Sequence, residues 1–336
     1  MKKFISQKDM RIANILEVLS LIRKEKSVTR KEIQNIMGLS WGGVSQIVSR
    51  LLELSYVVEE KSQDNISSGR RPGCIEINAS DNYIIGIDVN MSGLYAVVIN
   101  LKNEIIYEEA KIPDTKDKDS FLASIYELLD SVTEKYKKNT VLALGVAMQG
   151  EVDTENGISL GTSVKGWKNI PLSDILKERY GVPSYIAHDP DCILSAATRE
   201  NKEDAVLVRV DKGLGMAVIK NGSLIIGSGM HEIGRCKVLT EKGEEELHRV
   251  YFKSDKSDDE KNEALAFVIA NSIILFNVKK LLVCGTAFNE EEELTNLKTL
   301  LEKHASRTLD IRRYDVKRAA FGAAIFAIED YLKYIK

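Results

Sequence analysis

The feature that most limits the fold of this chain is an order of elements that occurs twice. After residue 80, YIIGIDV, LYAVVIN and EIIYEEAKI read as successive strands, followed by a helix over residues 119–137 and the strand VLALGVAM. The same order returns with AVLVRV, GMAVIK, SLIIG, a helix over residues 263–276 and KLLVCG. This repeat predicts two related α/β lobes with a cleft between them.

The first 78 residues follow a different pattern, with three helices ahead of two extended segments. Thr29 followed by Glu32 forms a capping box that starts the second helix, and Gly38 ends it. Ser40 caps the third helix, whose apolar residues recur at helical spacing. A short helix, a tight glycine turn and a longer helix, followed by segments 56–61 and 73–78, predict a winged helix-turn-helix domain.

In a domain of this kind the third helix lies in the major groove of DNA. The loop between the extended segments carries adjacent arginines, which the negative potential of a narrow minor groove attracts. The residues expected to face DNA are Thr29, Arg30, Ser40, Trp41, Ser45, Gln46, Arg50, Arg70 and Arg71. The alternative is a small helical domain with a solvated, charged loop.

The charge distribution favours the first of these readings. Residues 1–75 contain 13 basic and 8 acidic side chains, a net charge of +5, and the overall charge of −3 leaves −8 for the rest. A basic unit on an acidic body suggests that only the first unit meets a polyanion. The first ten residues have no apolar stretch typical of a secretion signal, and the four cysteines form no CxxC pair. We therefore expect a cytoplasmic protein with no membrane contact.

Several motifs resemble the ROK family (repressors, open reading frames and sugar kinases), and specifically its repressor branch. They include GRRP, IGIDVNMSGLYAVVINL, GVAMQGEVDTENG, GWKNIPLSDILKERYGVP, KGLGMAVIKNGSLIIGSGMHEIG and FGAAIFAIE, which cover nearly the whole chain. The resemblance implies an α/β fold with an N-terminal winged helix-turn-helix and a two-lobed, actin-like or sugar-kinase-like (ribonuclease H-like) body. The expected boundaries are 1–78 for the first domain and 79–336 for the body. Within the body, lobe 1 is about 79–190 plus the C-terminal helix 317–336, and lobe 2 is about 191–316.

The departures from the family pattern argue against an enzyme. Where family kinases carry two glycines after the first strand of the body, this chain has Asn90 and Met91. The second phosphate loop begins with Asp211, which would repel phosphate. Asp189 matches the catalytic base of the kinases, but one carboxylate without phosphate loops does not transfer a phosphoryl group efficiently. The family's Cys-x-Cys zinc run is also missing, so we expect no metal site and no cofactor.

The ligand site implied by the resemblance is partly altered. Its residues are expected to be Ser163, His188, Asp189, Glu232 and Arg235. Arg235 stands where the family has a zinc-ligating histidine. It either holds an anionic effector or neutralises a cleft carboxylate left without zinc, and the sequence does not choose between these. Trp167 is expected to pack in the core rather than serve as a sugar platform.

Three classes of function remain open on these residues. The first is a regulator that represses carbohydrate-utilisation genes, binds an inverted-repeat operator in double-stranded DNA as a homodimer or tetramer, and responds to a small sugar-like effector. The second is a sugar kinase, which the missing glycines disfavour. The third is a regulator whose body only dimerises, which the retained Asp189 and Glu232 disfavour.

Overall fold

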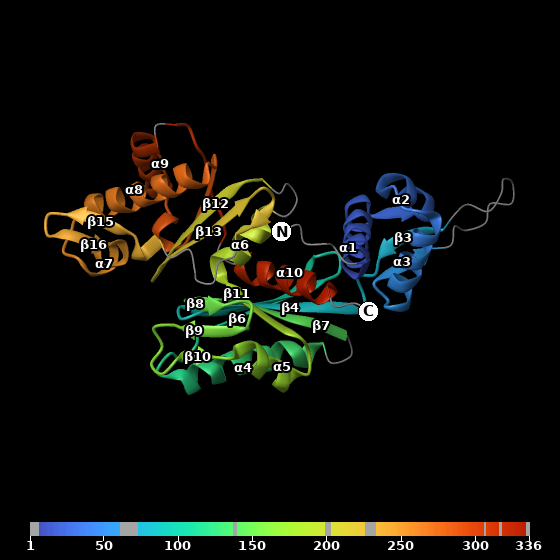
Figure 1. Cartoon of the computed structure of the whole chain (residues 1–336). Helices are drawn as coiled ribbons and strands as arrows, with labels where there is room; N and C mark the ends of the chain where they lie inside the picture. Colours follow the sequence, from blue (N-terminus) through green and yellow to red (C-terminus); the bar gives the residue numbers. More distant parts are fainter. Residues whose placement is uncertain are drawn as a thin grey trace.

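The computed structural model describes residues 7–60, 73–136, 140–198, 203–225, 233–305, 307–315 and 318–333. A small N-terminal domain stands at one end of the molecule, and a body of two lobes extends from it (Figure 1). Within these ranges no helix is both long and apolar enough to cross a membrane.

In its described residues the N-terminal domain combines helices with an antiparallel sheet of order β1-β3-β2. Its elements are α1 (Gln7–Glu25), β1 (Ser27–Thr29), α2 (Arg30–Met37), α3 (Trp41–Glu53), β2 (Val57–Glu60) and β3 (Cys74–Ile77). Strand β1 was not predicted, because only Val28 of its three residues is buried and so short a segment shows no periodicity. The two wing strands are each slightly shorter than the predicted extended segments.

The helix boundaries of this domain follow the local signals in the sequence. The capping box of Thr29 and Glu32 is present in both directions, and Gly38 ends α2 in the left-handed conformation at φ 65°. The Ser40 side chain caps α3 by accepting a hydrogen bond from the Gly43 N–H. These three predictions are confirmed.

Lobe 1 is built on a five-stranded sheet of order β11-β7-β4-β5-β6. Its strands are β4 (Asn82–Asn90), β5 (Gly93–Asn100), β6 (Ile105–Lys111), β7 (Thr140–Met148) and β11 (Ser184–His188). Helices α4 (Lys118–Lys135) and α5 (Leu172–Tyr180) cover one face, and α10 (Arg318–Leu332) covers the other (Figure 1). A small sheet of β8 (Glu151–Asp153), β9 (Ile158–Gly161) and β10 (Lys168–Ile170) lies beside it. Trp167 is buried there against Phe121, as predicted.

Lobe 2 repeats this topology. Its sheet has the order β14-β13-β12-β17-β18, with β12 antiparallel to β13 and parallel to β17, just as β4 is antiparallel to β5 and parallel to β7. The strands are β12 (Ala205–Val210), β13 (Leu214–Lys220), β14 (Ser223–Leu224), β17 (Lys280–Cys284) and β18 (Asp310–Arg313). The predicted repeat is therefore confirmed in the strand order.

Helices and a hairpin complete lobe 2. They are α6 (Asp189–Thr198), the short 3-10 helix Ile233–Arg235, β15 (Lys237–Thr240), β16 (Gly243–Glu246), α7 (Leu247–Lys253), α8 (Asp258–Phe276), the 3-10 helix Thr286–Phe288 and α9 (Glu291–Ala305). Helices α8 and α9 pack on one face of the sheet, and α6 packs on the other, next to α10. Helix α8 begins earlier than predicted because Ser257 and Glu260 form a capping box.

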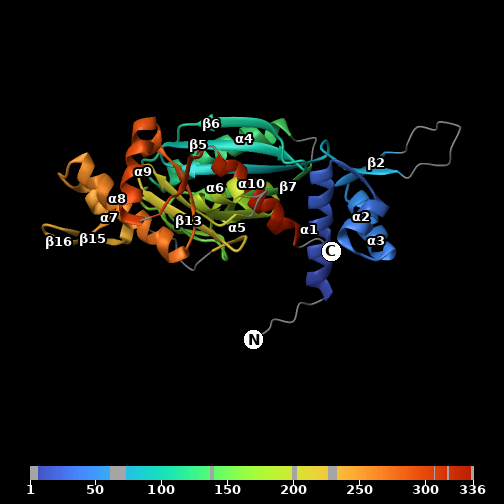
Figure 2. The same cartoon turned by 90° about the horizontal axis from the view of Figure 1, so that it is seen from above.

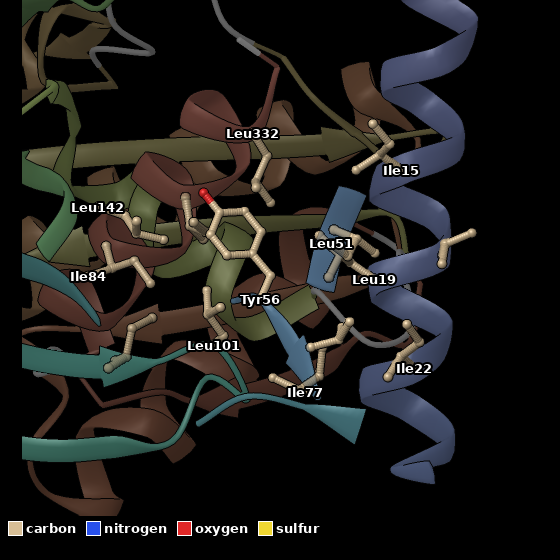
Figure 3. Close-up of a cluster of buried hydrophobic side chains, with 14 of the residues drawn as sticks. Ile15, Leu19, Ile22, Leu51, Tyr56, Ile77, Ile84, Leu101, Leu142 and Leu332 are labelled. Carbon is tan, nitrogen blue, oxygen red and sulfur yellow. The ribbon is translucent and has the colours of Figure 1, made fainter. Parts of the chain in front are cut away.

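The N-terminal domain shares a hydrophobic core with lobe 1. One buried cluster joins Ile15 and Leu19 of α1 and Tyr56 to Ile84 of β4 and Leu332 of α10 (Figure 3). The C-terminal end of α10 lies beside α1 in both views (Figures 1 and 2). The domain is thus packed onto the body over a continuous apolar surface.

Candidate functional site

A cleft of about 300 Å³ lies between the two lobes, and both lobes supply side chains to it. Among the lining residues from lobe 1 and from the start of α6 are Met91, Gln149, Glu151, Thr162, Ser163, His188 and Asp189, and among those from lobe 2 are Arg209, Asp211, Lys212 and His248. This volume is at the lower end of ordinary small-ligand pockets. The polar and charged side chains among its lining residues can form hydrogen bonds with a hydroxylated ligand.

Three of the predicted ligand-binding residues line this cleft together. Ser163 lies in the loop after β9, His188 ends β11 and Asp189 begins α6. His188 and Asp189 are both buried, with His188 Nε2 3.5 Å from Asp189 Oδ1. Glu232 lies outside the described residues. Whether these side chains bind a ligand stays a prediction.

Arg235 lies at the edge of the cleft and forms an ion pair with Glu151, which lines it. Glu151 belongs to β8 of lobe 1, and Arg235 belongs to the 3-10 helix of lobe 2. The sequence did not indicate this partner, because the two residues are 84 positions apart. The arginine side chain is 64% exposed, so the pair lies at the mouth of the cleft.

Arg209 of β12 is the charged centre of the cleft, and sequence reasoning missed it. Its side chain is only 8% exposed. The guanidinium lies 2.6 Å from Asp189 Oδ2, 2.8 Å from Asp211 Oδ2 and 3.8 Å from Asp88 Oδ2. Asp88 belongs to β4 of lobe 1, so the arginine connects the two lobes. The available signal was an arginine among the apolar residues of AVLVRV, since buried arginines are rare unless paired.

Two buried carboxyl groups that are affected by the charge of Asp189 have raised pKa values. Burial raises the pKa of Asp88 to about 7, against the lowering effect of Arg209 and together with the charges of Asp189 and Asp211. Burial, with a smaller contribution from Asp189, raises the pKa of Asp191 to about 8. Asp88 Oδ1 and Asp191 Oδ1 are buried without a hydrogen-bond partner within the described part of the chain. Asp191 is therefore mostly a neutral carboxylic acid at pH 7.

Replacing Asp191 by asparagine is expected to stabilise the protein, and more so as the pH rises. The unfolded carboxyl ionises near 3.8 and the folded one near 8, so the aspartate costs stability increasingly between these values and fully above them. The neutral amide removes this cost. We expect equal stability near pH 4 and a gain of about 1–3 kcal/mol at pH 8.5. Urea unfolding across this range measures it, and a difference that is independent of pH would contradict it.

The two turns that bear the family's phosphate-loop positions both contain side-chain hydrogen bonds, some of them to distant parts of the chain. The Met91 N–H donates to Gln149 Oε1 at 3.1 Å, and the Ser92 N–H donates to Asn90 Oδ1 at 2.8 Å. In the second turn, Asp211 accepts a hydrogen bond from the Thr286 N–H at 2.8 Å and pairs with Arg209. In the first turn, the N–H groups of Met91 and Ser92, which would cradle a phosphate in an open turn, already have partners.

The predicted DNA-facing residues divide into three groups. The side chains of Thr29 and Ser40 cap helices. Arg30 pairs with Glu59 of β2, and Arg50 pairs with Glu53 at 3.1 Å.

The third group is the outer surface of α3. Trp41, at 53% exposure, and Gln46 are exposed, and Ser45 is half-buried. Arg70 and Arg71 lie outside the described residues. Contact with DNA stays a prediction for all nine residues, and α3 offers the surface on which it can be tested.

Metal binding has no support in the described ranges. No three His, Cys, Asp or Glu side chains there lie close enough together to hold a metal ion. Cys236 is exposed, and burial lowers the pKa of His248, which lies in the cleft. The absence of a metal site stays a prediction.

Comparison with known proteins identifies the body of the chain. The model of the ROK family matches residues 84–245. The chain carries a ROK family domain. This ROK domain includes most of lobe 1 and the part of lobe 2 that contains Arg209 and Asp211.

Relatives of the ROK domain include named regulators. The xylose repressor of Caldicellulosiruptor bescii is 28% identical over 225 residues, which is 64% of this chain and 55% of that protein. The N-acetylglucosamine repressor of Escherichia coli O157:H7 is 26% identical over 238 residues, 67% of this chain and 57% of that protein. The chain thus spans little more than half the length of the curated relatives it matches.

Solved structures show how far the fold is shared. A ROK family transcriptional regulator, described as a homologue of the Escherichia coli Mlc protein, superposes with a TM-score of 0.80 at 18% identity and covers 96% of this chain and 97% of its own. A ROK family glucokinase from Streptomyces griseus gives a TM-score of 0.60 at 16% identity, covering 74% of this chain and 99% of its own. The fold prediction is therefore confirmed. ROK domains of this shape occur in both a regulator and a kinase.

Proposed function

We propose that this protein is a DNA-binding transcriptional regulator that represses carbohydrate-utilisation genes. The observation that carries the proposal is the exposed outer surface of α3, presented by a capped helix-turn-helix whose core continues into the ROK body. The names of the relatives, xylose repressor and N-acetylglucosamine repressor, support the same function. As such a regulator, the protein works in the cytoplasm, where its DNA is.

Binding as a dimer follows from this mode of recognition. A helix-turn-helix domain reads one half-site, and two domains related by a twofold axis read an inverted repeat with half-sites about one helical turn apart. A homodimer, or a tetramer made of two dimers, is therefore the proposed binding form. Selection of bound sequences from a random duplex library tests this, and an inverted repeat is the expected product.

Base recognition by α3 is tested with two substitutions on its outer surface and one control substitution in α1. Ser45→Ala and Gln46→Ala are expected to reduce the preference for the selected operator over random DNA by about tenfold each, since one good base contact contributes roughly 1–3 kcal/mol. Ser20→Ala, at an exposed position of α1, is the control and should leave the preference unchanged. Mobility-shift titrations measure both affinities. If Ser20→Ala has the same effect as Ser45→Ala, α3 does not read the bases.

The cleft of this protein is proposed to bind an effector rather than to phosphorylate a sugar. Asp189, the residue that matches the kinase base, forms an ion pair with Arg209, with 2.6 Å between Oδ2 and Nη1. With Oδ2 engaged by this buried guanidinium, Asp189 is poorly placed to accept the proton of a sugar hydroxyl. The turn after β4, which Gln149 and Asn90 close, offers no open phosphate cradle. Sugar-dependent turnover of ATP would overturn this part of the proposal.

The proposed effector is a sugar or a neutral sugar derivative. Carboxylate and imidazole groups of Asp189 and His188 can accept and donate hydrogen bonds to hydroxyl groups. The alternative of an anionic effector held by Arg235 has lost its main support, because that guanidinium pairs with Glu151. A thermal-shift screen of neutral sugars, sugar phosphates and uronic acids distinguishes the two. Saturation at about 100 times the Kd stabilises the folded state by about 2.7 kcal/mol.

A further inference from the structure

We propose that α10 is a rigid link that transmits the relative position of the two lobes to the winged helix-turn-helix domain. The proposal deepens the regulator function proposed above and rests on it. It is carried by close contacts at three places along one helix: against α6, against the sheet of lobe 1, and against the DNA-binding domain.

The first place joins α10 to the cleft. Asp189 lines the cleft and is the first residue of α6, one turn ahead of Cys192. A Cβ atom added to Gly322 of α10 would lie 1.9 Å from the Cys192 carbonyl oxygen, so the two helices meet backbone to backbone. Interiors packed this tightly shift as units rather than deform. A movement of α6 therefore has to move α10 or open a gap.

The second place holds α10 along lobe 1. A Cβ atom at Gly86 of β4 would lie 2.0 Å from the Ala320 carbonyl oxygen, and one at Gly145 of β7 would lie 2.0 Å from that of Ala323. The helix thus rests directly on the backbone of the two central strands. Most of its buried residues over this length are alanine or glycine, which lets the helix lie close to the strands.

The third place joins α10 to the DNA-binding domain. Leu332, in the last turn, belongs to the same buried cluster as Ile15 and Leu19 of α1 (Figure 3). Tyr331 lies close enough to Tyr56 to affect its ionisation, and Tyr56 directly precedes wing strand β2 and is only 2% exposed. Burial, and next the neighbouring Tyr331, raise the pKa of Tyr56 well above its usual value. The tyrosine pair ties the end of α10 to the base of the wing.

Two further hydrogen bonds fix the N-terminal domain on the body. Arg23 Nε of α1 donates to the Leu101 carbonyl at 2.9 Å, and Asn82 Nδ2 of β4 donates to the Ser55 carbonyl at 2.9 Å. With these contacts and the shared core, the domain has a defined orientation. A displacement at the end of α10 then changes that orientation, and with it the distance between two recognition helices in a dimer.

The test perturbs the cleft and observes the N-terminal domain, using the full chain without DNA or effector. Arg209→Lys keeps the charge but loses the forked guanidinium that holds Asp88 and Asp189, so the lobes are less firmly connected. Arg209→Lys is introduced into the wild type and into Leu332→Ala, which removes the contact of the last turn of α10 with α1. Hydrogen–deuterium exchange of α1 and α2 is then measured with and without Arg209→Lys in each background. Trp167→Phe, in the core on the opposite face of lobe 1, is the control for general destabilisation.

We expect Arg209→Lys to speed exchange in α1 and α2 by about fivefold or more, the lower end of ordinary couplings between sites. In the Leu332→Ala background, Arg209→Lys should change the exchange rates by less than about twofold, because the end of α10 no longer packs fully against α1. Trp167→Phe should not alter exchange in these helices. If Leu332→Ala does not fold, Tyr331→Phe replaces it as the cut.

An equal effect of Arg209→Lys in both backgrounds, or no effect in the wild type, would overturn the link. Because the measurement uses no DNA, its failure leaves the proposed DNA binding untouched. Conversely, a chain that binds no operator could still show the coupling. The two proposals therefore fail separately.

Discussion

Arg209→Met is expected to destabilise the protein by about 3–5 kcal/mol, the usual cost of leaving buried charges without their partner. The methionine fills much of the same space but leaves Asp88 and Asp189 facing each other across the lobes without a cation. Denaturant unfolding measures the loss. The same substitution at Arg312, whose side chain is 63% exposed and pairs with Asp310 at the surface, is the control and should change stability little.

The loss caused by Arg209→Met should shrink as the pH falls. Arg209 lowers the pKa of Asp88, which burial otherwise raises, so removing the arginine raises the folded-state pKa further. A raised carboxyl pKa costs stability above the unfolded pKa, and protonation at low pH removes that cost. Equal stability losses at pH 5 and pH 8 would show that the arginine contributes packing rather than charge compensation.

The local features of this fold were predictable from the sequence because their causes are local. The caps at Thr29 and Ser40 and the turn at Gly38 each depend on residues within four positions of one another. The repeat of one order of elements in the two lobes was predictable for a related reason. Each lobe repeats one sequence of strands and helix, and short connections leave few ways to arrange it.

The charge pairs of the cleft were not predictable, because they join residues that are distant in the chain. Arg209 meets Asp88 across 121 positions, and Arg235 meets Glu151 across 84. The resemblance identified carboxylates of the cleft, but nothing in the sequence pairs Arg235 with Glu151. Gln149, which closes the turn at Met91, carried no signal, since a single glutamine next to a strand fits many roles.

The same limit applies to α10, whose motif FGAAIFAIE was recognised only as part of a family resemblance. The sequence shows small residues in this helix and glycines in two strands, but nothing in it pairs Gly86 with Ala320 or Gly145 with Ala323. Only the fold brings these positions together. Only small residues fit where another backbone lies this close. Adding a methyl group at such a position tests how much the close contact contributes to stability.

Gly322→Ala is expected to destabilise the protein by about 3 kcal/mol or more, because the added methyl group would lie 1.9 Å from the Cys192 carbonyl oxygen. Backbone cannot move aside as a flexible side chain can, so α6 and α10 must separate and expose their shared core. Gly42→Ala is the matched control: it makes the same change inside α3, where nothing lies within 4 Å of the new Cβ. There alanine should stabilise by roughly 0.5–1 kcal/mol through its higher helix propensity. Thermal and urea unfolding of both variants give the comparison. The packing argument would be wrong if both substitutions raised the Tm, since propensity alone would then account for the result at Gly322.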